Sequence, residues 1–276
     1  MSHLNRSLAP FGESAWKEID REAAQVLRRT LAARRLVRVN GPHGWERSSI
    51  GMGRTHRIAG PVSGVETLLR EAHPMVECRT PFRLARRELD TIERGGTDPD
   101  LGPLIEAARI AAHAEDKAVF EGLEPAGIRG LLAVGSPQAL DIHDDYETYP
   151  KVVATALTKL RDQGVSGPYA IALSSRCHQG LTETLNDGGY PIMKLLQQQL
   201  DGPIVWAPAL EGAVVLSTRG DDYQLEIGQD FAVGYRHHDA DNVDLYLEES
   251  FTFLCRTDEA IVPLRRAPQG KVETHA

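Results

Sequence analysis

A long polar arm constrains this chain more than any other feature of its sequence. Residues 41–75 hold many polar side chains, few large apolar ones and six glycines, namely Gly41, Gly44, Gly51, Gly53, Gly60 and Gly64. Because so little apolar surface cannot form its own core, we expect an extended arm or hairpin, closed by a short helix with a capping box at Ser63 and Glu66. A polar arm of this length is unusual within a compact monomer, so we expect it to lie on a neighbouring subunit.

Composition argues against several classes of protein. The chain has 276 residues, enough for one large or two modest domains. Lys and Arg number 31 and Asp and Glu number 39, and the net charge of −8 argues against a nucleic-acid binder, which presents a basic face. No stretch approaches the roughly 18 apolar residues that span a bilayer, and the N-terminal residues lack the apolar segment of a secretory signal. We therefore expect neither a membrane protein nor a secreted one.

The three cysteines support the same conclusion. Cys78, Cys177 and Cys255 are odd in number and far apart in the sequence. This pattern does not fit a disulfide framework or a zinc knuckle, and it indicates a reduced, cytoplasmic protein.

Apolar residues that recur every three or four positions predict helices in several segments. The first follows Ser14, the predicted N-cap, and extends to Leu31. Further helices are predicted at 86–96, 100–121, 148–163, 174–185 and 191–200. Glu115 lies on the apolar face of the 100–121 helix, and it needs a partner because an unpaired buried carboxylate is costly.

Period-two alternation predicts strands, of which 243–255 is the clearest. Shorter strands are predicted at 36–39, 75–84, 169–173, 204–206, 213–217 and 223–227. Helices and strands together indicate an α+β fold. The elements from 100 to 235 and those that flank them predict two interleaved domains rather than two consecutive ones. Residues 265–276 show no periodicity and are predicted to form a disordered tail.

No segment carries a complete catalytic or metal-binding motif. The adjacent Cys177 and His178 have the residue types of a thiol hydrolase, but neighbours on a helix point about 100° apart, which favours a small buried thiol. His237 and His238 have the residue types of metal ligands but occupy a polar loop between strands. Glycine-rich phosphate loops and a nucleophile elbow are absent from the sequence. We therefore predict no catalytic residue and no metal ligand.

A series of short motifs runs in order along the chain: Leu8-Ala9-Pro10, Trp16-Lys17-Glu18-Ile19-Asp20, Gly41-Pro42, Gly44-Trp45-Glu46, Leu89-Asp90, Ile92-Glu93-Arg94-Gly95, Ala114-Glu115-Asp116, Phe120-Glu121-Gly122, Gly167-Pro168-Tyr169, Gly189-Tyr190-Pro191, Ser217-Thr218-Arg219-Gly220, Gly228-Gln229-Asp230 and Glu249-Ser250-Phe251-Thr252-Phe253. Each motif alone is weak. The ordered set resembles the encapsulins of family 1, the linocin-like shell proteins of bacterial nanocompartments.

The resemblance implies the fold of tailed-phage major capsid proteins, with a peripheral domain, an axial domain and an extended E-loop. It divides the chain into the N-terminal helix and peripheral domain at 1–40, the E-loop at 41–75, the peripheral domain with its long spine helix at 76–129, the axial domain at 130–225, a return to the peripheral domain at 226–264, and the tail at 265–276. It implies self-assembly into a closed icosahedral shell of about sixty subunits in the cytoplasm, without nucleic acid or membrane. The enclosed cargo would be a dye-decolourising peroxidase or a ferritin-like protein, held through its C-terminal targeting peptide.

The resemblance also implies a cargo-peptide site on the inner face, between the N-terminal helix and the peripheral domain. Its residues are Leu27, Leu31, Arg34, Val39, Asp230 and Phe231. An apolar strip with a basic residue would accept an extended apolar peptide by side-chain docking. For Leu27 and Leu31, a place in the core is an equally good interpretation.

A second implied site is the loop that surrounds the fivefold pore. It comprises Glu183, Thr184, Leu185, Asn186, Asp187, Gly188, Gly189 and Tyr190. Five copies of Asp187 would form a negative ring that favours cations, and the two glycines would keep the loop mobile. Some family members stack a flavin on an aromatic residue after the E-loop. Because Arg86 and Arg87 stand there, we expect no flavin and no other cofactor.

Two other functions remain open at this point. A phage-derived major capsid protein that packages nucleic acid would share the fold, although the acidic composition argues against it. A cysteine hydrolase would use Cys177 as its nucleophile.

Overall fold

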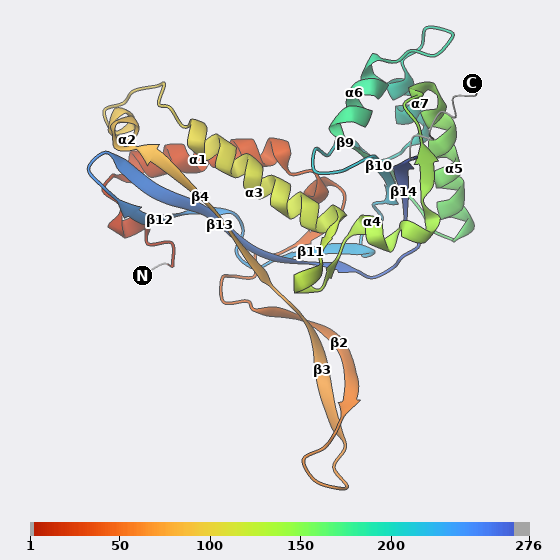
Figure 1. Ribbon diagram of the computed structural model, residues 1–276, viewed down its shortest axis with the longest axis horizontal. Coiled ribbons are helices and arrows are strands. Elements are labelled where there is room, and N and C mark those ends of the chain that lie inside the picture. The colour runs from red at the N-terminus through yellow and green to blue at the C-terminus, as the bar shows by residue number, and fades with distance from the viewer. Residues whose placement is uncertain (1–2, 268–276) are drawn as a thin grey trace, which may run out of the picture.

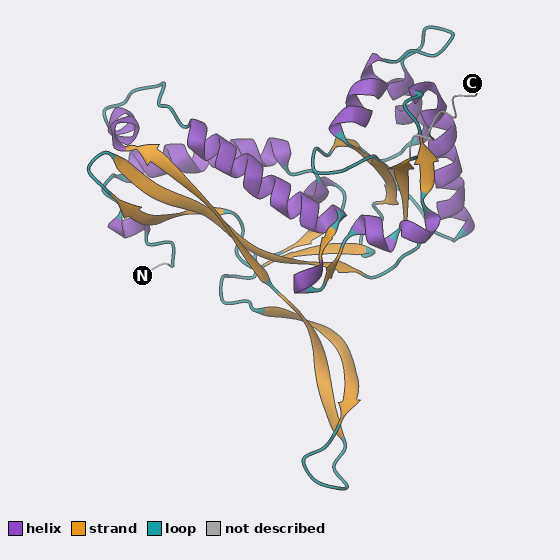
Figure 2. Ribbon diagram, in the orientation of Figure 1, coloured by secondary structure: helices purple, strands orange, loops and turns teal. Residues whose placement is uncertain are grey.

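The computed structural model describes residues 3–267 and shows an elongated molecule with three parts (Figure 1). Two parts are built on five-stranded sheets, and the third is a two-stranded hairpin that projects away from them. Helices pack against both sheets (Figure 2), so the predicted α+β class is confirmed. Within the described residues, no helix is both long and apolar enough to cross a membrane.

The first sheet is organised around β13 (Asn242–Cys255), which confirms the strand predicted at 243–255. One edge of β13 pairs with β4 (Val76–Ala85). The other edge pairs first with β12 (Ala232–His238) and then with β11 (Tyr223–Ile227), beside which β1 (Arg38–Asn40) runs in parallel. Because β13 is paired on both edges, its backbone is satisfied while most of its side chains are buried.

Helices α1 (Glu13–Thr30), α2 (Arg86–Glu93) and α3 (Gly102–Phe120) accompany this sheet. Helix α3 packs on β4 and β13, and α1 lies beside it (Figure 1). The alanine-rich face of α3 permits this close approach. The predicted N-cap at Ser14 is wrong, because α1 begins one residue earlier and the Ser14 hydroxyl instead donates to Glu93 at 2.6 Å.

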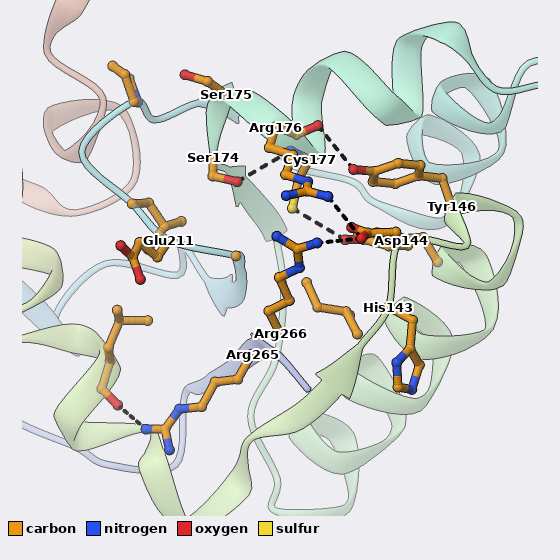
Figure 3. Close-up of a pocket in the computed structure, with 16 residues that line it drawn as sticks. His143, Asp144, Tyr146, Ser174, Ser175, Arg176, Cys177, Glu211, Arg265 and Arg266 are labelled. Carbon is orange, nitrogen blue, oxygen red and sulfur yellow. Dashed lines mark hydrogen bonds and ion pairs between the residues drawn. The ribbon is translucent and has the colours of Figure 1, made fainter. Parts of the chain in front are cut away.

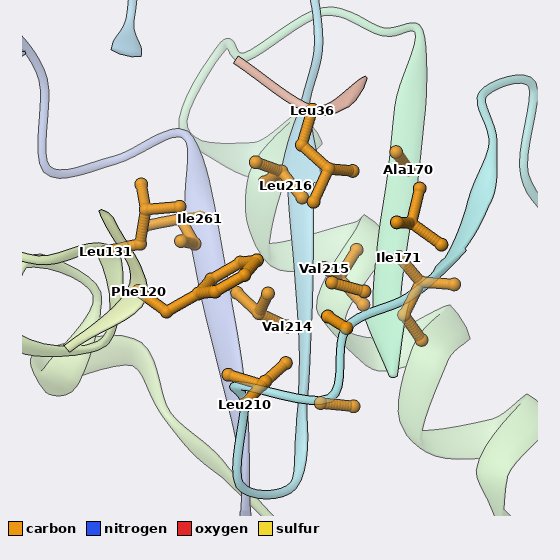
Figure 4. Packing of buried hydrophobic residues seen from close by; sticks show 14 of the residues in the cluster. Leu36, Phe120, Leu131, Ala170, Ile171, Leu210, Val214, Val215, Leu216 and Ile261 are labelled. Carbon is orange, nitrogen blue, oxygen red and sulfur yellow. The ribbon is translucent and has the colours of Figure 1, made fainter. Parts of the chain in front are cut away.

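The second sheet has the strand order β7 (Leu140–Ile142), β14 (Ile261–Arg266), β10 (Ala213–Ser217), β8 (Tyr169–Leu173) and β9 (Ile204–Trp206). The helices of this part are α4 (Leu131–Val134), α5 (Tyr149–Asp162), α6 (Ser175–Glu183) and α7 (Ile192–Gln199). Its core also takes Leu36 and Phe120 from segments that belong to the first part (Figure 4). A continuous core therefore joins the two sheets.

Short elements complete the described chain. Strands β5 (Gly122–Leu123) and β6 (Ile128–Arg129) form a small ladder between α3 and α4. The 3-10 helices are η1 (Arg6–Leu8), η2 (Ala33–Arg35), η3 (Glu124–Ala126), η4 (Ser136–Gln138) and η5 (Tyr146–Thr148).

The projecting hairpin consists of β2 (Ser49–Ile58) and β3 (Thr67–Pro74), which pair in antiparallel register. It forms the polar arm predicted from the glycine-rich segment (Figure 1). The short helix predicted at Ser63 and Glu66 is absent, because strand pairing leaves only a connecting turn there and no apolar helical stripe follows the capping residues. Glu66 instead forms an ion pair with Arg57 of the opposite strand.

The strand pairing shows that three of the predicted domain boundaries lie elsewhere. Residues 223–225 belong to the first sheet through β11, although 130–225 was assigned to the axial domain. Residues 261–264 belong to the second sheet through β14, although 226–264 was assigned to the peripheral domain. The tail was predicted to begin at residue 265, but Arg265 and Arg266 are the last two residues of β14. The predicted tail from 268 onward lies outside the described residues.

Candidate functional site

Arg34 is the centre of a charged cluster that joins the turn after α1 to α3 and β13. Its Nε lies 2.9 Å from both carboxylate oxygens of Glu115, and its Nη2 lies 2.5 Å from Glu115 Oε2. Its Nη1 donates to Asp230 Oδ1 at 2.9 Å. The guanidinium carbon lies 5.1 Å from the centre of the Phe231 ring. The structure therefore brings together Arg34, Asp230 and Phe231, three of the six predicted cargo-site residues.

Two fully buried carboxyl groups meet beneath Arg34. Glu115 is 0% exposed and Glu249 is 1% exposed. Glu249 Oε2 lies 3.5 Å from Arg34 Nη2. Burial, the charge of Glu115 and a hydrogen bond with that residue raise the pKa of Glu249 well above its usual value. The raised pKa favours the protonated form of Glu249, which lessens the repulsion between the two buried carboxyl groups.

Asp116, the next residue of α3, fixes the backbone that carries Arg34. Its carboxylate accepts hydrogen bonds from the backbone N–H groups of Ala32 and Ala33, at 2.8–3.1 Å. Burial raises the pKa of Asp116 to about 7, although these hydrogen bonds oppose the shift. The sequence indicated that Glu115 needs a partner. It did not indicate that Asp116 and Glu249 belong to the same cluster.

The three other predicted residues lie in different surroundings. Leu27 and Leu31 are buried, at 7% and 8% exposure, within the core between α1, α3 and the first sheet. The core interpretation of these two leucines is therefore the one that the structure supports. Val39 on β1 is 40% exposed and presents its side chain to solvent.

The predicted pore loop begins at Glu183, the last residue of α6, and ends before α7. Asn186 closes it, because its side-chain oxygen accepts from the N–H groups of Gly188 and Tyr190, at 3.1 and 2.8 Å. Its own N–H donates to the carbonyl of Tyr190 at 2.9 Å. Asp187 is exposed at the tip. These bonds link Asn186 to the far end of the loop, and the mobility expected from Gly188 and Gly189 stays a prediction.

Comparison with known proteins decides the family. A family model described as "Encapsulating protein for peroxidase" matches residues 1–252. A type 1 encapsulin shell protein of Rhodospirillum rubrum is 46% identical over 276 residues, covering 98% of this chain and 99% of the relative. One of Mycobacterium tuberculosis is 45% identical and covers 96% and 99%. This chain belongs to the type 1 encapsulin shell proteins.

Solved structures show the encapsulin fold independently. A virus-like particle protein from Pyrococcus furiosus superposes with a TM-score of 0.65 at 16% identity, covering 91% of this chain and 99% of that one. A capsid protein of Myoviridae phage XM1 superposes with a TM-score of 0.54 at 11% identity, covering 85% and 91%. The predicted tailed-phage capsid fold is therefore confirmed. The phage likeness concerns the fold alone, whereas the relatives at 45–46% identity are encapsulin shell proteins.

The encapsulin relatives are named as shell proteins, and this chain is a shell protein rather than an enzyme. The thiol of Cys177 is buried and lies 3.3 Å from the hydroxyl of Tyr149. His238 binds the hydroxyl of Tyr235 at 2.6 Å, and His237 faces Asp244 at 3.7 Å. Within residues 3–267, no group of three or more potential ligands could hold a metal ion.

Proposed function

We propose that this encapsulin subunit assembles into a closed icosahedral shell of about sixty copies and encloses a cargo enzyme in the bacterial cytoplasm. The cargo is a dye-decolourising peroxidase, or otherwise a ferritin-like protein, held through its C-terminal targeting peptide. The match to a model described as an encapsulating protein for peroxidase carries this proposal.

The hairpin supports assembly through neighbouring copies. Val62, Val65, Leu68 and Leu69 lie at or near its tip, and each is at least 50% exposed. The hairpin projects from the other described elements (Figure 1), and the exposure of these side chains shows that residues 3–267 leave them largely uncovered. Exposed apolar side chains gathered in one place are typical of an interaction surface. A second copy of the chain is the partner that a homomeric shell provides.

The charges around Arg34 refine the proposed cargo site. Glu115 and Asp230 occupy all three nitrogens of the Arg34 guanidinium, so Arg34 has little capacity left for an acidic peptide group. The carboxylate of Asp230 is 47% exposed, and Phe231 and Val39 supply apolar surface. We therefore expect an extended peptide with apolar side chains and a basic one, rather than an acidic one.

Cargo loading tests this site. Shells are purified from cells that also express the native cargo, and mass spectrometry gives the ratio of cargo to shell protein. We expect Val39→Asp to lower that ratio while electron microscopy still shows closed particles. Ile110→Asp is the matched control, because Ile110 is 52% exposed on α3, outside the predicted site. Equal loading of the two variants would remove Val39 from the site.

Assembly itself is tested on the wild-type chain. Size-exclusion chromatography and electron microscopy should show closed particles at native protein concentration. A monomer or small oligomer under these conditions would contradict the shell proposal. Nucleic acid protected from nuclease inside purified particles would favour the capsid alternative.

We also propose that residues 183–190 line the fivefold pore. The exposed carboxylate of Asp187 at the loop tip supports a negative ring in the assembled shell. The hydrogen bonds from Gly188 and Tyr190 to Asn186 support this role, since they hold Asp187 at the tip of the turn.

A further inference from the structure

A pocket lies in the second part of the molecule, away from the Arg34 cluster. It has a volume of about 650 Å³ and is formed where β14, the start of α6 and the loop after β7 meet (Figure 3). This volume falls within the range of about 300–1,000 Å³ that is typical of small-molecule sites. Neither the family description nor the cargo and pore proposals involve this pocket.

The floor of the pocket is apolar and uncharged. Ile142, Tyr149 and Leu210 line it, and each is at most 3% exposed. Burial raises the pKa of Tyr149, so its hydroxyl stays neutral. A floor of this kind accepts an aromatic ring or a short aliphatic group.

The mouth of the pocket has an excess of positive charge. Arg176 Nη2 donates to Asp144 Oδ2 at 2.9 Å, and Arg266 Nη2 donates to the same oxygen. Figure 3 shows the two guanidinium groups side by side at this carboxylate. Two arginines thus share one carboxylate, while Arg265, which also lines the pocket, donates to the carbonyl of Leu132 at 3.2 Å. This excess is local, because the whole chain carries a net charge of −8.

Most donors of the two arginines are unused by the protein. A guanidinium has five N–H groups, and within residues 3–267 each of these two side chains forms one hydrogen bond, to Asp144. Ser174 also lines the pocket and is 7% exposed. Its oxygen accepts from the N–H of Cys177 at 3.3 Å, which leaves its own proton available for donation. Donors from α6 and β14 thus converge on one place.

We propose that this pocket binds a small organic anion, whose oxyanion bridges Arg176 and Arg266 and whose apolar body lies against Ile142, Tyr149 and Leu210. The ligand class is a carboxylate or phosphate monoester attached to a group of about the size of one ring. Asp144 already shows that both guanidinium groups can reach a single oxyanion oxygen. Paired arginines suit such ligands because their forked donors match carboxylate and phosphate geometry.

Isothermal titration calorimetry on assembled full-length shells tests the proposal. The probes are benzoate, phenyl phosphate and inorganic phosphate, at one ionic strength because salt screens exposed charges. We expect the aromatic anions to bind more tightly than inorganic phosphate. Preference between benzoate and phenyl phosphate identifies the headgroup. Arg176→Gln and Arg266→Gln should each weaken binding by about tenfold.

Asp144→Asn separates a binding role from a structural one. This variant breaks the same ion pairs as the arginine variants, yet it frees both guanidinium groups for the ligand. We therefore expect tighter binding of the anion, the opposite of the arginine effect. Arg87→Gln on α2 is the matched control and should leave binding unchanged, because the Arg87 side chain pairs with Glu88 at 3.0 Å and does not line the pocket.

Two results would overturn the proposal. One is the absence of saturable binding of all three probes to wild-type shells up to about 10 mM. This result would mean that the pocket is closed or filled by a neighbouring subunit in the shell. The other is a loss of affinity in Asp144→Asn similar to that in Arg176→Gln, with particles intact by electron microscopy.

Discussion

Replacement of Arg34 by methionine tests the energetics of the buried carboxyl cluster. Arg34 is the one basic side chain that contacts Glu115 within residues 3–267, through Nε at 2.9 Å and Nη2 at 2.5 Å. Methionine occupies much of the same space without charge. Glu115 is 0% exposed, so in Arg34→Met its carboxylate remains buried with no cation.

Removal of one partner from a buried ion pair costs about 3–5 kcal/mol of unfolding free energy. For a chain of this size, each kcal/mol lowers the melting temperature by about 2–4 °C, so we expect a decrease of about 6–20 °C at pH 8. The pH dependence has a definite sign. The defect in Arg34→Met comes from the uncompensated buried charge of a carboxylate, and protonation at low pH removes that charge. The defect should therefore be smaller at pH 5 than at pH 8.

The assay is thermal unfolding followed by tryptophan fluorescence, at pH 5 and pH 8 and at matched protein concentration, because assembly contributes to apparent stability. Arg34→Met/Glu115→Gln should recover most of the loss at pH 8, since no uncompensated charge remains. Arg38→Met is the control, because Arg38 forms an exposed ion pair with Asp221 and such pairs contribute at most about 1 kcal/mol. Wild-type stability of Arg34→Met at pH 8, or a larger defect at pH 5, would refute the reasoning.

Three further predictions follow from other parts of the structure. The pKa of Asp116 is about 7 in the folded chain and 3.8 in the unfolded chain, so the free energy of unfolding should decrease as the pH rises between these values, by up to about 4 kcal/mol. In denaturant titrations, Asp116→Asn should remove this pH dependence. Leu68→Asp/Leu69→Asp at the exposed hairpin should prevent particle formation in electron microscopy while circular dichroism stays unchanged, since both side chains are at least 50% exposed. Asp187→Lys should slow the entry of small cations into shells in stopped-flow measurements with an enclosed indicator, and unchanged entry would place the pore elsewhere.

The fold was largely predictable where periodicity and terminators agree. Strand β13 follows from its period-two alternation, and α3 follows from its apolar face between Pro103 and Gly122. Local signals were wrong where strand pairing decided the outcome. Ser63 and Glu66 fit a capping box, but the backbone between β2 and β3 only connects two paired strands. A local motif carries no information about which other segment a strand will pair with.

The Arg34 site was predictable only in part, for a related reason. The resemblance supplied Arg34, Asp230 and Phe231, and helical periodicity supplied a buried Glu115 that needs a partner. The pair itself spans 81 positions in the sequence, and the pair of Glu249 with Arg34 spans 215. No spacing rule covers contacts of this range, because they depend on how α3 and β13 pack against each other.

Those long-range contacts change the chemistry expected of the site. In the sequence, Arg34 is a cation beside apolar residues, a pattern that predicts an extended apolar peptide as the partner. In the folded chain, Glu115 and Asp230 occupy its donors, while Asp230 itself is 47% exposed. The open charge at this surface is therefore negative, because the buried carboxylate of Glu115 compensates the arginine from within. In the proposed cargo site, Glu115 would thus determine which charge a peptide encounters, although it is buried and does not touch the surface.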